Sequence, residues 1–299
     1  MSIDYYSLND SVNIISKDFL KNIINIYGLE MPKEKLELLN ALLKKDFINV
    51  NDYSEDDLSF FGEYSNIPTA HGGKVKGDGN IYIYPYKFSD KNKSSNLAAY
   101  RIIKNDLLAH EIFHYVISIS SYHVSEDKLN LFLKENNFED KEKAIKGLSH
   151  FMSEGFVQLY ADDYALKSGL EKPKSNYNQN MEFVKNILMS MKEPSASIAF
   201  NLDYIDILNK AKEDSNIDFV DKYINLMDDN YKLKVIIEEV KRDLGSEFDT
   251  SNQFNKLVIL NRDDRINYIK NFIVKNSNNK EKLMNLLNEY DNNEYKKTK

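Results

Sequence analysis

A His-Glu-x-x-His motif, formed by His110, Glu111 and His114, is the stretch whose residue types and spacing most clearly indicate chemistry. Residues four apart lie one above the other on an α-helix, so His110 and His114 can direct two imidazoles at one point beside the helix axis. Such a point suits a zinc ion. Glu111 can reach a water at that ion without binding the metal, as a general base in metal-assisted hydrolysis must. The motif predicts two zinc ligands and a base, and one protein ligand remains to be found.

The surroundings of the motif favour a buried helix. The chain has only five histidines in 299 residues, so two of them four apart around a Glu seldom arise by chance. The alternative is an amphipathic core helix whose polar side chains are satisfied without a metal. Apolar residues flank the motif on both sides: Leu107, Leu108, Ile112, Phe113, Val116 and Ile117.

The third ligand distinguishes the families of zinc enzymes that carry this motif. A metzincin would continue with Gly and a third His, but Ile117 and Ser120 stand at those positions, which excludes that class. Downstream, residues 153–164 begin Ser-Glu-Gly-Phe and continue as an apolar, helical pattern. Together the two segments resemble the gluzincins, in which a Glu on a second helix completes the metal site. Ser153 stands where that family usually has Asn, and the gap after His114 is longer, so residues 118–150 would be an insertion.

The resemblance implies that Glu154 is the third ligand of one zinc ion per chain, with a fourth position open to water. It further implies a zinc metallopeptidase that acts on a peptide or protein substrate through water activated by Glu111. The Gly-x-Met-Glu-Asn segment of similar aminopeptidases is missing, which favours an endopeptidase. His150 lies one turn before Glu154 and could compete for the metal, since a three-histidine site is chemically possible.

Several other side chains are candidates for supporting roles. Gln158 and Asp162 follow Glu154 on the same helical face, where either can accept the free N–H of a ligating histidine or simply form a polar edge. Tyr122 and His123 are candidates for stabilising the oxyanion of a tetrahedral intermediate. His71, in a glycine-rich loop, could approach a substrate or be solvated.

Composition excludes several classes of protein. The net charge of −7 is spread along the chain, which argues against a nucleic-acid partner. There is no cysteine, so any metal must use His and carboxylates. No run approaches the roughly 18 apolar residues that a membrane span requires. The first residues do not have the pattern of a secretory signal, so a cytoplasmic protein is the default expectation, and a secreted one if the sequence is a mature form.

The elements that must position the site are mostly helical. The predicted fold is α+β and mainly α, with a helical N-terminal cap (1–50), a zincin-like catalytic core with a small edge sheet (51–172) and a helical C-terminal lobe (173–299). Residues 80–86 alternate in type as a strand does, and Pro85 marks either an edge position or the end of the strand. The resemblance to gluzincins implies that this strand pairs with substrate backbone, and the alternative is a hairpin strand that only packs. Helices are expected at 10–27, 32–43, 97–119 (one or two), 126–134, 138–168, 181–191, 195–211, 219–227, 231–244, 254–260, 266–274 and 280–290.

Two alternatives to a peptidase remain open. One is a non-catalytic zincin-like binding module or toxin-associated scaffold, which would hold zinc without hydrolysis or hold none. The other keeps the site but uses it for a different hydrolysis, because fold and metal do not determine the substrate.

Overall fold

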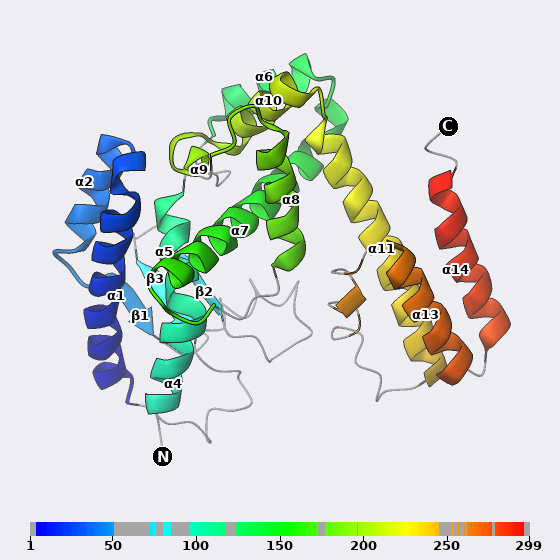
Figure 1. Ribbon diagram of the computed structural model, residues 1–299, viewed down its shortest axis with the longest axis horizontal. Coiled ribbons are helices and arrows are strands. Elements are labelled where there is room, and N and C mark those ends of the chain that lie inside the picture. The colour runs from blue at the N-terminus through cyan, green and yellow to red at the C-terminus, as the bar shows by residue number, and fades with distance from the viewer. Residues whose placement is uncertain are drawn as a thin grey trace. The chain divides into compact units, whose positions relative to one another are not determined.

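The computed structural model describes residues 4–50, 72–75, 80–84, 96–117, 124–172, 177–195, 197–244, 253, 256–257, 260, 262–276 and 279–295. The chain divides into two compact units, Met1–Asn216 and Ile217–Lys299. Helices dominate both, and the first also holds a small sheet (Figure 1). The predicted mainly α fold with a small sheet is therefore confirmed. The divisions predicted after residues 50 and 172 both fall inside the first unit.

The first unit contains most of the described elements. Its helices are α1 (Tyr5–Tyr27), α2 (Lys33–Leu42), α4 (Asn96–Ile102), α5 (Leu108–Val116), α6 (Glu126–Glu135), α7 (Glu142–Lys167), α8 (Asn178–Ser190), α9 (Ile198–Asn201) and α10 (Tyr204–Ser215). Its strands are β1 (Ile48–Val50), β2 (Gly72–Val75) and β3 (Ile81–Tyr84). Helix α6 confirms the helix expected between the two halves of the metal site.

The sheet has the strand order β1-β3-β2, with β3 parallel to β1 and antiparallel to β2. Pro85 predicts either an edge strand or the end of a strand, and the edge position is wrong, because β3 is hydrogen-bonded on both sides. Alternation of residue types shows that a segment is extended, but it does not reveal which strands pair, since pairing depends on distant parts of the chain. Pro85, on which the edge assignment rested, lies outside the described residues.

Helix α1 covers the outer edge of β1 with two side-chain amides. Asn13, which is 6% exposed, accepts hydrogen bonds from the backbone N–H groups of Phe47 and Ile48, both at 3.0 Å, and donates to the carbonyl of Ile48 at 2.9 Å. One turn earlier, Asn9 accepts a hydrogen bond from the N–H of Val50 at 2.7 Å and donates one to the carbonyl of Val50 at 2.9 Å. These amides stand in for a neighbouring strand, so the backbone groups at this edge are satisfied.

The segment that leads into the motif is one helical run with an irregular turn. Helix α4 continues through a π-helical turn, Ile103–Leu107, directly into α5. A π turn shifts the phase of a helix and occurs frequently at functional sites. Helix α5 is deeply buried, as the apolar residues around the motif predicted, and Leu108, Phe113 and Val116 are fully buried.

Helix α5 is held against α7 by stacked aromatic rings. The ring of Tyr160 in α7 stacks on Phe113 of α5, with centroids 5.5 Å apart, and on Phe200 of α9, at 4.6 Å. Burial of such large rings is a major source of stability. Helix α7 packs on both α5 and α8 (Figure 1). It ends at Lys167, and Gly169 follows with a φ of +66°, next to a hydrogen bond from Leu170 N to Ala165 O.

The second unit is built from α11 (Phe219–Leu244), α13 (Arg262–Asn276) and α14 (Lys280–Tyr295). Its core contains Leu233, Ile236, Ile237, Val240, Leu257, Ile269, Ile273, Leu283, Leu287 and Tyr290. Arg265 is buried there and is hydrogen-bonded to Asp229, to the Tyr290 hydroxyl and to the carbonyl oxygens of Leu257 and Leu260. The charge is thus paired, as burial of a guanidinium requires.

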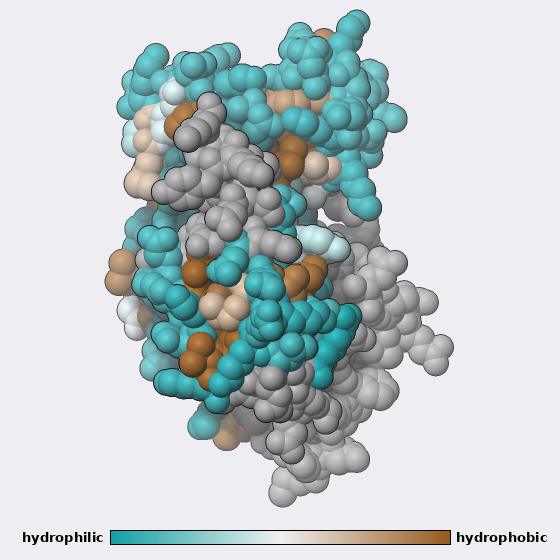
Figure 2. Space-filling model, turned by 90° about the vertical axis from the view of Figure 1, so that its right-hand side faces the viewer, coloured by the Kyte–Doolittle hydropathy of each residue, from teal (hydrophilic) through white to brown (hydrophobic). Residues whose placement is uncertain are grey.

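Polar side chains cover most of the described surface on the face shown in Figure 2, where hydrophobic residues occur in smaller groups. Among the described helices, none combines the length and apolar character that crossing a membrane would need.

Candidate metal centre

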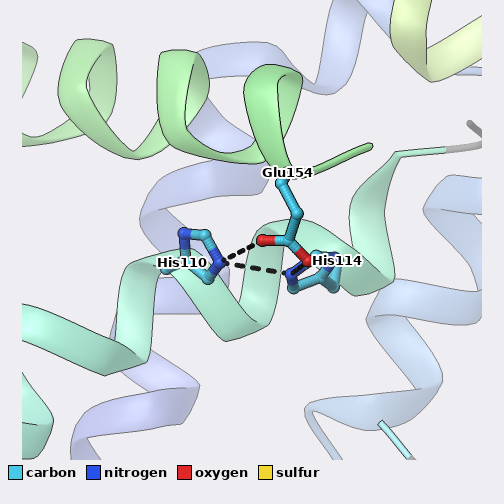
Figure 3. A group of neighbouring side chains, drawn as sticks. All are labelled: His110, His114 and Glu154. Carbon is cyan, nitrogen blue, oxygen red and sulfur yellow. Dashed lines mark hydrogen bonds and ion pairs between the residues drawn. The ribbon is translucent and has the colours of Figure 1, made fainter. Parts of the chain in front are cut away.

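Three predicted ligands meet between α5 and α7. Nε2 of His110 lies 3.2 Å from Nε2 of His114 and 3.2 Å from Oε2 of Glu154. Nε2 of His114 lies 3.5 Å from Oε1 of Glu154. Figure 3 shows both imidazoles pointing from α5 toward the carboxylate that descends from α7. The i,i+4 spacing aligns the histidines, and the packing of α7 on α5 brings in a residue from far along the chain.

The separation of these atoms fits a metal ion. Zinc–ligand bonds are about 2.0–2.1 Å long, so in a tetrahedral site two donor atoms lie about 3.3 Å apart. The three separations of 3.2, 3.2 and 3.5 Å have this size. Two imidazoles and one carboxylate are also the donor set of sites that leave a fourth position open. His110, His114 and Glu154 therefore form a largely buried group that can hold a metal ion.

A second layer of hydrogen bonds orients His110. Its Nδ1 lies 3.2 Å from Oε1 of Gln158, and the amide nitrogen of Gln158 donates to Asp162 at 2.7 Å. Because the amide nitrogen of Gln158 donates to Asp162, the amide oxygen of Gln158 faces His110 and accepts a hydrogen bond from its Nδ1–H. The lone pair of His110 is then on Nε2, the atom nearest Glu154 and His114. Gln158 thus makes the predicted hydrogen bond to a ligating histidine, whereas Asp162 contacts Gln158 and not the histidine.

Glu111 is also buried here, with 5% of its surface exposed. Burial raises the pKa of its carboxyl group, and the nearby charge of Glu154 raises it further, while His114 and His110 oppose this shift. A carboxyl group whose pKa is raised can both accept and release a proton closer to neutral pH. Its role as the base remains a prediction.

His114 and Glu154 form a charge pair in the metal-free protein. Burial is the largest influence on the pKa of His114 and lowers it, but the charge and hydrogen bond of Glu154 and the charge of Glu111 outweigh burial and raise it to about 9. Burial likewise acts to raise the pKa of Glu154, but the two histidines together hold it well below its usual value. Glu154 is therefore ionised at neutral pH, as a metal-binding carboxylate must be.

Tyr177, at the start of α8, is a residue of this site that the sequence analysis missed. Its ring stacks on His110, with centroids 5.1 Å apart and planes at 12°. Its hydroxyl forms a hydrogen bond with Glu154. The pKa of Tyr177 is raised well above its usual value by burial, by the charges of Glu154 and Glu111 and by this hydrogen bond. The hydroxyl therefore stays protonated and is the donor in the hydrogen bond to Glu154. The residue lies between the helices expected at 138–168 and 181–191, where nothing in the pattern indicated a site.

His150 lies outside the group of three ligands. Its Nδ1 is 3.8 Å from Oε1 of Glu154, but its side chain is 77% exposed and it is not among the residues whose donor atoms come together. Glu154, rather than His150, is the third member of the group. Tyr122, His123 and His71 lie outside the described residues, so their predicted roles remain predictions.

Comparison of the chain with models of protein families, with curated proteins and with solved structures finds no match.

Proposed function

We propose that this protein is a zinc-dependent metallopeptidase, and specifically an endopeptidase. The observation that carries the proposal is the meeting of His110, His114 and Glu154 at metal-ligand separations, with the buried Glu111 beside them. The donor set is that of a catalytic site rather than a closed structural one, which would use four protein ligands. The resemblance of both helical segments to the gluzincins supports the choice of zinc and of a peptide substrate.

In this proposal each side chain has a defined task. Zinc bound by this group supplies a Lewis acid that polarises a carbonyl oxygen and lowers the pKa of a water molecule. Glu111 accepts a proton from the attacking water and later delivers it to the leaving amine, a use that suits its raised pKa. Gln158 keeps the proton of His110 on Nδ1, so that Nε2 remains free for the metal.

Strand β2 is the best placed of the described strands to receive an extended substrate. It has a partner on one side only within the described sheet, and it packs near α5, the helix that carries the motif. Its outer N–H and C=O groups can pair with a peptide backbone, and backbone pairing places few demands on substrate sequence. This role was expected of the strand at 80–86, but β3 is paired on both sides.

Digestion of a peptide library by the zinc-loaded chain tests the proposal. We expect internal cleavage of some peptides, loss of cleavage after treatment with a chelator, and recovery when zinc is returned. The His114→Ala variant should be inactive before and after zinc is added. A protein that holds one zinc ion but cleaves no library peptide would contradict the assignment as a peptidase while leaving the metal centre in place.

A further inference from the structure

Tyr177 connects two of the three metal-binding side chains from outside the motif. Its ring lies almost parallel to the imidazole of His110, and its hydroxyl donates a hydrogen bond to the carboxylate of Glu154. These two ligands come from different helices, α5 and α7. Tyr177 precedes α8 directly, so a third element contacts the site.

The approach of α8 to α7 depends on Gly155, the residue after Glu154. A Cβ atom at Gly155 would lie 2.5 Å from the carbonyl oxygen of Asn180 and 2.9 Å from Cγ1 of Val184. Both distances are too short for real contacts, and the nearest atom belongs to backbone, which cannot rotate away. The side chain of Asn180 also donates to the carbonyl oxygen of Phe151 at 3.0 Å, which ties the first turn of α8 to α7.

We propose that Tyr177 is a positioning residue of the metal centre, held over His110 and Glu154 by the close packing of α8 on α7 at Gly155. The proposal rests on the metal site of the proposed function and adds to it a residue that directly precedes a third helix, α8, and contacts two of the ligands. Tyr177 acts through the two ligands that it contacts.

The chemistry of the two contacts explains how Tyr177 strengthens metal binding. An ionised carboxylate has about four lone-pair positions, so a hydrogen bond from a phenol occupies one and leaves others for a metal. The bond restricts rotation of the carboxylate, and the stacked ring restricts rotation of the imidazole. Ligands that are held in place before the ion arrives lose less freedom on binding, and outer hydrogen-bond partners of metal ligands typically contribute about 10- to 100-fold in metal affinity.

The Tyr177→Phe variant separates the hydroxyl from the ring. Phenylalanine retains the stacking on His110 and removes only the hydrogen bond to Glu154. We expect its zinc affinity, measured by competition with a chromophoric chelator, to fall by about 10-fold, and that of Tyr177→Ala to fall further. Tyr268→Phe is the matched control, since it removes a hydroxyl bonded to Gln253 in the second unit and should leave zinc affinity unchanged.

The Gly155→Ala variant tests the packing that holds Tyr177. The added methyl group must displace α8, so zinc affinity should fall, and adding Tyr177→Phe should then have little further effect because the contact is already lost. Gly28→Ala is the control, at a glycine of ordinary helical φ, −59°, where an added Cβ would meet only the ends of the Leu36 and Ile24 side chains, at 3.3 and 3.6 Å.

Thermal unfolding of the metal-free variants distinguishes positioning from a general structural role. Tyr177→Phe should unfold within about 5 °C of the parent, the shift expected for one lost hydrogen bond, and yet bind zinc about 10-fold more weakly. Binding within about twofold of the parent, or loss of the cooperative unfolding transition, would overturn the proposal. If the parent chain itself bound no zinc, the metal site of the proposed function would fail instead, so the two failures are distinguishable.

Discussion

Gln158 accepts a hydrogen bond from Nδ1 of His110 at 3.2 Å, and both residues are buried. This contact joins α7 to α5 by a route separate from the Glu154 carboxylate. Gln158 lies one helical turn after Glu154, so the same face of α7 supplies both a metal-binding oxygen and the group that sets the tautomer of a metal-binding histidine.

Replacing Gln158 by Leu should weaken zinc binding by about 10-fold or more, because the Nδ1 proton of His110 loses its acceptor and the ring can take either tautomer. Asp162→Asn should have a smaller effect, since it changes only the group that orients the Gln158 amide. Chelator competition on both variants measures the difference. Equal affinity for the parent and Gln158→Leu would show that the contact does not orient His110.

Replacing Glu111 by Gln should lower the rate of peptide hydrolysis by at least about 100-fold, because the amide cannot accept a proton from water. Zinc should still bind, since Glu111 is not among the three ligands. The measurements are turnover of a cleaved peptide and metal content of the same sample. Glu193→Gln, at an exposed site, is the matched control. A metal-loaded Glu111→Gln protein with parental turnover is the result that would refute the role of this residue.

Zinc affinity should rise with pH because His114 is protonated in the metal-free protein, with a pKa raised to about 9. Zinc binds the neutral imidazole, so it displaces one proton, and its apparent affinity should increase about tenfold per pH unit between about pH 7 and 8.5. Titration with zinc in buffered chelator at several pH values measures this slope. A change of less than about threefold over the whole range would contradict the assignment.

The raised pKa of His114 also predicts how the stability of the metal-free protein varies with pH. The folded-state pKa of His114 lies above its ordinary value of 6.5, so its protonated form stabilises the fold below that pH. This contribution is lost as the pH rises from 6.5 to about 9. Urea unfolding of the metal-free parent should therefore show a decline in stability over this range that His114→Asn does not show. Parallel pH profiles for the two proteins would argue against the charge pair with Glu154.

Replacing Asn13 by Ala should destabilise the first unit by about 3 kcal/mol, because it leaves two buried N–H groups and one carbonyl of the 47–48 backbone without their partner. Asn40→Ala is the matched control, since the exposed Asn40 bonds only to a carbonyl in its own helix. That change should alter the free energy of unfolding by no more than about 0.5 kcal/mol. Urea unfolding compares the two. Similar stabilities would mean that α1 does not support the edge of β1 through this side chain.

Local patterns predicted much of the site. The spacing of His110 and His114 requires only that the segment be helical, and the buried apolar residues of α5 ensure this. Gln158 was expected because it shares a helical face with Glu154. Glu154 itself was identified by family resemblance, since nothing in the spacing shows that α7 packs against α5.

Contacts between segments that are distant in the sequence could not be predicted from local patterns. Tyr177 reaches the site only because α8 folds back along α7, and the glycine at 155 that allows this does not by itself show which helix packs against it. The central position of β3 depends on partners on both sides. Helix boundaries also differed: the helix expected at 195–211 is broken at Leu202, where Asp203 caps α10 through the N–H groups of Ile205 and Asp206.

The two helices expected at 219–227 and 231–244 form one helix, α11. The residues between them, 228–230, are polar but include neither proline nor glycine, so the helix can continue through them.

Anomalous diffraction at the zinc absorption edge from crystals of the zinc-loaded chain tests the central claim most directly. We predict one strong anomalous peak per chain, about 2 Å from Nε2 of His110, Nε2 of His114 and a carboxylate oxygen of Glu154. Zinc at another position, or no peak at these three side chains in a crystal grown with excess zinc, would contradict the account.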